Sequence, residues 1–163
     1  HYGGGAGVYW NCTSTVPNCA GYAVGSHSYM DISVIKFGGI GPIIESEYAN
    51  MVINAYRRLS GLEMTWEGED ANQDAYVPGN RFRIAIRAKL YSPYQEGLLH
   101  IYHVMVQLRD GSWASKMNTD PSRWCGLINV RTDSNVDNWN TLANPNLEYR
   151  HTMFFQVQGS YAP

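Results

Sequence analysis

The chain has 163 residues, of which 44% are hydrophobic and 16% charged, so it can bury a core without disulfides and is not composed like a disordered protein. Its formal net charge of −2 gives no reason to expect nucleic acid or an anionic membrane as a partner, and no hydrophobic run approaches the length of a membrane span. These properties predict one domain over residues 1–163, opening with a Gly-rich arm over residues 1–17.

A short helix is predicted to begin at Cys19. Pro17 and Asn18 precede the cysteine, and asparagine is a favoured N-cap residue. Gly25 is suited to end this helix. The stretch after it, SVIKFGGIGP, is rich in turn residues and predicts a brief strand or a loop.

A longer helix is predicted from Ile43 to Leu59, with Pro42 in its first turn and Gly61 at its end. Hydrophobic residues recur at helical spacing along it. We interpret this stripe as core packing, with a buried face made of Tyr48, Met51, Val52 and Ala55.

The hydrophobic period changes to two after a polar loop over residues 68–79. In RFRIAIRAKL, residues 81–90, hydrophobic side chains share one face of a predicted strand. The other face is basic, and we interpret it as solvated in preference to anion-binding; its residues are Arg81, Arg83, Arg87 and Lys89.

The segment LLHIYHVMVQLRDGSWASKMN predicts a hairpin, because two β-rich runs flank Asp110-Gly111, a favoured pair for a two-residue type I′ turn. In that register His103 lies opposite Asn118, and Lys116 is the diagonal neighbour on the same face. The tail adds one or two strands. Helices followed by strands predict an α+β fold in which N-terminal helices pack on an antiparallel β-sheet.

The cysteines Cys12, Cys19 and Cys125 have no zinc-site spacing, and no metal or cofactor is expected. In an exported protein we expect a Cys12–Cys125 disulfide that leaves Cys19 free, and in a cytosolic one three reduced thiols. Export is the favoured location.

Cys19 is the candidate nucleophile. A helix N-terminus lowers the pKa of a cysteine, and a base within hydrogen-bond reach completes the activation. The hairpin register selects His103 as the base and Asn118 as the residue that orients it, while His151 stays possible. The alternative is that Cys19 is an inert buried thiol, which is the commoner role of a lone cysteine.

The blocks NCAGYAVG and HVMVQLRDGSWASK resemble a group of bacterial papain-like proteins, related to the NlpC/P60 and CHAP amidases, over about a third of the chain. The resemblance implies a papain-like fold, an exported toxin or effector, a Cys19–His103 dyad, and substrate contacts from Tyr22, Trp113 and Lys116. Glycine often stands in that group where this chain has Asn118. The matching positions are Asn18, Cys19, Tyr22, Ala23, Gly25, His103, Gln107, Asp110, Gly111, Trp113 and Lys116.

Three functions follow from these observations. The first is a thiol-dependent hydrolase or acyl transferase, a cysteine peptidase or amidase, acting on a peptide or amide bond of a peptide or protein substrate. The second is a non-catalytic carbohydrate- or peptide-binding module of the same fold, suited to five tryptophans and twelve tyrosines. The third, supported by no other motif, is a copper protein that uses the amine and imidazole of His1.

Overall fold

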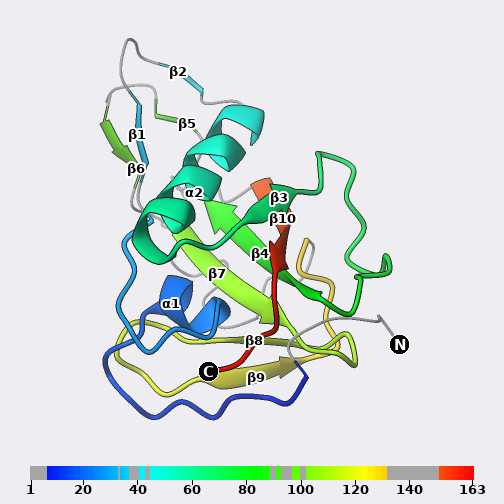
Figure 1. Cartoon of the computed structure of the whole chain (residues 1–163). Coiled ribbons are helices and arrows are strands. Elements are labelled where there is room, and N and C mark those ends of the chain that lie inside the picture. The colour runs from blue at the N-terminus through cyan, green and yellow to red at the C-terminus, as the bar shows by residue number, and fades with distance from the viewer. Residues whose placement is uncertain are drawn as a thin grey trace.

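A computed structural model describes residues 7–32, 34–36, 41–42, 45–88, 91–92, 97–99, 102–131 and 151–163 (Figure 1). In chain order, its elements are α1 (Cys19–Ala23), β1 (Val34–Lys36), β2 (Gly41–Pro42), α2 (Glu45–Ser60), β3 (Met64–Trp66), β4 (Arg81–Ala88), β5 (Tyr91–Ser92), β6 (Gly97–Leu99), β7 (Tyr102–Gln107), β8 (Trp113–Ser115), β9 (Arg123–Gly126) and β10 (His151–Gln158).

Six strands form one antiparallel sheet in the order β3-β10-β4-β7-β8-β9. β10, from the end of the chain, inserts between β3 and β4, so the sheet is closed by a long-range pairing (Figure 1). Two further pairs, β1 with β6 and β2 with β5, form separate two-stranded sheets. The α+β class and the antiparallel sheet are therefore as predicted from the sequence.

The sheet has a hydrophobic core on each face. Alternate side chains of a strand point to opposite faces. In β7, Val104 and Val106 belong to the larger core, which both helices share, whereas Met105 belongs to the smaller one together with Trp113. The segment around Val130 covers that smaller core. The helices therefore occupy one face of the sheet, and irregular chain covers the other.

α2 follows the predicted pattern, with Tyr48, Val52 and Ala55 buried and Met51 partly buried. It ends at Gly61, which has φ +70° and donates its N–H to the carbonyl oxygen of Arg57. Pro42 is not in the first turn as predicted, because it lies in β2; the described helix begins at Glu45, and the predicted first residue, Ile43, lies outside the described residues. Proline has no N–H to donate, which is tolerated in a two-residue strand as well as in a first helical turn.

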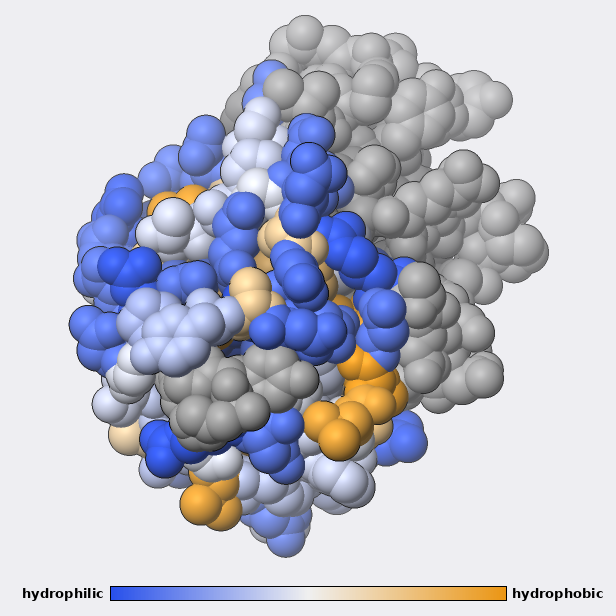
Figure 2. Space-filling model, turned by 90° about the vertical axis from the view of Figure 1, so that its right-hand side faces the viewer, coloured by the Kyte–Doolittle hydropathy of each residue, from blue (hydrophilic) through white to orange (hydrophobic). Residues whose placement is uncertain are grey.

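The described part of the chain contains no helix long and apolar enough to cross a membrane. Over the described residues, the face shown in Figure 2 is mainly hydrophilic, and its hydrophobic residues gather in small, separate groups.

Candidate functional site

Cys19 is the first residue of α1, as predicted. Asn18 is the N-cap, and its side-chain oxygen accepts hydrogen bonds from the N–H groups of Gly21 and Met30, each at 3.0 Å. Its amide donates to the carbonyl oxygen of Met30 at 2.6 Å. A Cβ on Gly21 would lie 2.1 Å from the carbonyl oxygen of Ser28, so glycine is required where the chain passes so closely. The sequence thus fixes the position of the thiol locally.

The thiol of Cys19 lies in the helix-side core and is 8% exposed. Burial raises the pKa of Tyr56 and of Tyr102, and the charge of a Cys19 thiolate raises both further. The Tyr56 hydroxyl donates to the carbonyl oxygen of Ala20 at 3.0 Å. The surroundings of Cys19 therefore include two phenols that remain protonated at neutral pH and cannot serve as bases.

His103 is buried in β7, with 2% of its surface exposed. It lies opposite Arg87 of β4, and strand alternation puts it on the side of Met105, away from Val104, whose core contains Cys19. This geometry assigns His103 and Cys19 to opposite faces of the sheet. It gives no support to a Cys19–His103 dyad.

The predicted hairpin register is wrong by one residue. Met105 lies opposite Ser115, so the two-residue turn at Asp110-Gly111 does not form. The N–H of Leu108 instead donates to the carbonyl oxygen of Ser112 at 2.7 Å, which encloses a three-residue loop. A type I′ turn needs positive φ at both central residues, and here Gly111 has it, at +88°, while Asp110 does not. The Asp110 carboxylate accepts from the N–H and the hydroxyl of Ser112, which stabilises the longer loop and lowers the pKa of Asp110.

Asn118 is therefore not the cross-strand neighbour of His103. The ladder between β7 and β8 ends at Ser115, and Asn118 adopts a left-handed conformation with φ +47°, the only non-glycine residue to do so in the described part of the chain. Asparagine tolerates this conformation better than most residues.

The three residues expected to contact substrate are all fully buried. The hydroxyl of Tyr22 donates to the carbonyl oxygen of Trp10 at 2.7 Å, and Trp113 lies in the smaller core. The ammonium group of Lys116 donates to the carbonyl oxygens of Pro17 at 2.7 Å and Asn118 at 2.5 Å. Each has an internal structural role, and none exposes the surface that a substrate contact needs.

The remaining residues of the sequence analysis add no catalytic group in the described ranges. All three cysteines are free thiols, so the Cys12–Cys125 bond is not formed in this structure. His27 is exposed and its ring lies 4.9 Å from that of Trp10. His1 and His100, and the side chain of His151, lie outside the described residues. Among those that are described, no cluster of histidines, cysteines and carboxylates has the arrangement of a metal site.

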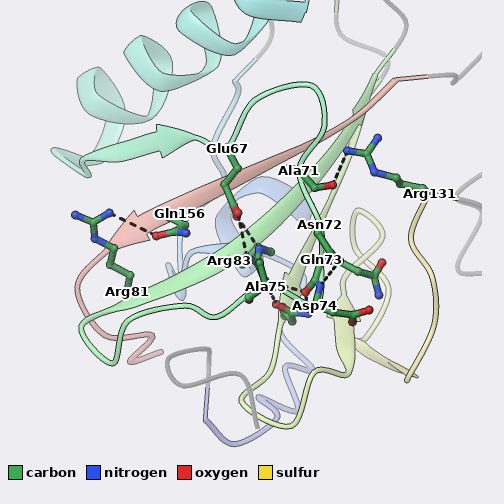
Figure 3. Close-up of polar contacts among 11 residues, drawn as sticks. Glu67, Ala71, Asn72, Gln73, Asp74, Ala75, Arg81, Arg83, Arg131 and Gln156 are labelled. Carbon is green, nitrogen blue, oxygen red and sulfur yellow. Dashed lines mark hydrogen bonds and ion pairs between the residues drawn. The ribbon is translucent and has the colours of Figure 1, made fainter.

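The basic face of β4 is mostly buried, which corrects the expectation of a solvated face. Arg83 pairs with Glu67, at 2.6 Å from Nε to Oε1, and also donates to Gln107 and to the carbonyl oxygen of Gln73 (Figure 3). Arg87 donates to the carbonyl oxygens of residues 130 and 131, and burial lowers its pKa to about 10. These arginines bind the irregular chain that covers the second face of the sheet.

A cavity of about 520 Å³ lies between the N-terminal segment and the C-terminal tail. This volume falls in the range of small-ligand sites. Its lining combines aromatic rings, backbone of small residues and two arginines: Gly7, Val8, Tyr9, Trp10, Asn11, Gly79, Arg81, Arg109, Ser160, Tyr161 and Pro163.

Ser122 fixes the N-terminal wall of this cavity. Its hydroxyl oxygen accepts from the N–H of Cys12 at 2.7 Å, donates to the carbonyl oxygen of Trp10 at 3.0 Å, and is bonded to the Tyr9 hydroxyl at 2.9 Å. Trp10 also stacks on Tyr22, with ring centroids 5.0 Å apart. The segment predicted as an irregular arm is irregular, but over residues 7–12 it is held in place by these contacts.

Sequence reasoning missed this cavity, because its residues come from four separated parts of the chain. The one local signal was the aromatic pair Tyr9-Trp10 within an otherwise Gly-rich arm.

Compared with protein-family models, with curated proteins and with solved structures, the chain matches none.

Proposed function

We propose that this chain is a non-catalytic domain that binds a peptide in the cavity between its N-terminal segment and its C-terminal tail. The observation that carries the proposal is the cavity itself, with its volume of about 520 Å³ and a wall that Ser122 holds in one conformation. A preorganised wall reduces the entropy that binding costs.

A peptide fits this lining better than a carbohydrate does. A sugar ring is bound best on an open aromatic face, but Trp10 already stacks on Tyr22, and Tyr161 is 9% exposed with its ring edge-to-face against Phe82. The hydroxyl of Tyr161 is also engaged, since it donates to the carbonyl oxygen of Tyr22 at 2.6 Å. Two of the three aromatic residues in the described lining are therefore already packed against other rings, and the lining also offers backbone groups and two arginines, which suit a peptide.

Gly79 allows the cavity to be filled without straining the fold. It lines the cavity, has no positive φ, and a Cβ added there meets no atom within 4 Å. We expect Gly79→Phe to abolish binding of peptides selected from a random heptapeptide library, and Gly79→Ala to retain it. Equal binding by both variants would place the peptide site elsewhere, and failure of the unmodified protein to select any peptide would contradict the proposal.

Thiol-dependent hydrolysis is the second candidate, favoured by the position of Cys19 at the start of α1 beside a well-formed Asn18 cap. With His103 on the opposite face, the base would have to come from elsewhere, and His151 is the alternative within the chain. Rapid stoichiometric labelling of Cys19 by iodoacetamide at neutral pH, slowed in His151→Ala, supports this candidate. Labelling at the rate of an ordinary buried thiol removes it.

A further inference from the structure

Two arginines line the cavity, and neither has an acidic partner among the residues that the structure describes. Arg81 is the first residue of β4, and Arg109 belongs to the β7–β8 loop. The ion pairs found in the described ranges are Arg57–Glu63 and Arg83–Glu67, so neither cavity arginine is neutralised by a described carboxylate. Arg81 has a long contact of 3.4 Å with the neutral side chain of Gln156, and its guanidinium lies apart from the Arg83 cluster (Figure 3).

The positive charge is a local property of the cavity. The chain has a formal net charge of −2, yet the described residues of the lining include two arginines and no aspartate or glutamate. A concave site lined by charge of one sign concentrates the field and attracts the opposite charge. Arg81 is half-buried and Arg109 is exposed. A ligand anion compensates the charge of Arg81 more completely than a neutral amide such as Gln156 does.

We propose, resting on the peptide-binding function above, that the cavity selects peptides carrying a carboxylate, which Arg81 and Arg109 bind. A guanidinium presents a planar fork of donors that matches a carboxylate in a bidentate pair. The two guanidinium groups come from different elements, β4 and the β7–β8 loop, and both line the cavity. Tyr9 and Trp10 in the wall contact the hydrophobic part of the same peptide.

The test uses heptapeptide pools that differ only at a fixed central residue, which is glutamate, glutamine, lysine or phosphoserine. Binding is measured by fluorescence anisotropy with the full chain. We expect the glutamate pool to bind about tenfold more tightly than the glutamine pool, because a hydrogen bond to a charged group contributes more than a neutral one. We expect this preference to shrink with added salt.

Arg81→Gln and Arg109→Gln should each weaken binding of the glutamate pool by roughly tenfold and leave the glutamine pool unchanged. Arg58→Gln is the matched control, since it removes the same charge from the exposed surface of α2, away from the cavity lining. Circular dichroism checks that each variant is folded.

Four outcomes separate the two proposals. Equal binding of glutamate and glutamine pools, with Gly79→Phe still blocking both, overturns carboxylate selection and leaves peptide binding intact. If the phosphoserine pool binds more tightly than its extra charge explains, the choice of a carboxylate over a phosphate is overturned. If Arg58→Gln weakens binding of the glutamate pool equally, the effect is due to overall charge, and carboxylate selection is again overturned. No binding of any pool overturns the peptide-binding function itself.

Discussion

Ser122 allows the wall of the cavity to be tested by the loss of a single atom. In Ser122→Ala the buried N–H of Cys12 loses its shorter hydrogen bond and keeps the one of 3.1 Å to the carbonyl oxygen of Trp10, and the hydroxyl of Tyr9 loses its partner. The carbonyl oxygen of Trp10 also retains the hydroxyl of Tyr22 as a donor. A net hydrogen bond contributes about 0.5–1.5 kcal/mol, and the half-buried Tyr9 hydroxyl can turn to water, so the free energy of unfolding should fall by about 1 kcal/mol.

Urea unfolding followed by circular dichroism measures this change directly. A loss of about 1 kcal/mol in a protein of this size lowers the melting temperature by roughly 2–4 °C. Ser14→Ala is the matched control, since the Ser14 hydroxyl accepts a single exposed hydrogen bond, from the N–H of Val16. A Ser122→Ala variant as stable as the Ser14→Ala control would refute the role assigned to Ser122. Peptide affinity should fall with stability, because residues 9–12 form the cavity wall that Ser122 holds.

Three other substitutions or titrations test the structural roles assigned above. Asn118→Gly should keep or raise the free energy of unfolding, whereas Asn118→Val should lower it by about 1–2 kcal/mol, because a β-branched residue is strained at positive φ; urea unfolding compares them. Lys116→Met should lower it by about 2–4 kcal/mol, since the carbonyl oxygen of Pro17 loses a charge-assisted hydrogen bond in a buried place; a smaller loss than in Asn118→Val would contradict this. Burial raises the pKa of four tyrosines, so tyrosinate absorbance at 295 nm should include a step that appears only as the protein unfolds; they are Tyr22, Tyr56, Tyr102 and Tyr161. Their contribution to stability is complete below the unfolded pKa and is lost as pH rises above about 10; an absorbance curve with no step at unfolding would contradict their burial.

Local signals predicted the elements whose formation depends on nearby residues. The Asn18 cap and Gly25 bound α1, because both act on backbone groups within a few residues. The helical spacing of hydrophobic residues identified α2, and the alternation in RFRIAIRA identified β4. Each of these signals acts over a few neighbouring residues, so these elements could be predicted without knowledge of the tertiary fold.

The turn between β7 and β8 shows where such signals become ambiguous. Asp110-Gly111 favours a two-residue turn, but aspartate is equally suited to bind the N–H two residues ahead, which is what it does with Ser112. The two loops differ by one residue, and a one-residue shift exchanges every partner across the ladder. The side chain of Lys116 then belongs to the helix side, where it reaches Pro17, and not to the side of His103.

The burial of the basic face of β4 shows a second limit of sequence patterns. Alternation correctly groups Arg83 with Arg87 on one face, yet it carries no information about what covers that face. The cover consists of a loop containing Glu67 and Gln73 and of backbone at residues 130 and 131, far from β4 in sequence. The burial of the two arginines depends on those partners, just as the formation of the cavity depends on residues from both ends of the chain.

The residues that carry the papain-like resemblance have structural roles in this chain. Asn18 caps α1, Gln107 binds Arg83, Asp110 shapes its loop, and Lys116 ties β8 to the chain before α1. A pattern made of such residues predicts local geometry well, because capping, turn formation and internal hydrogen bonding are what these side chains do here. The chemical part of the prediction depended on one further condition, that a cysteine and a histidine share a face of the sheet. Strand parity decides that condition, and in β7 it turns the histidine toward the second core.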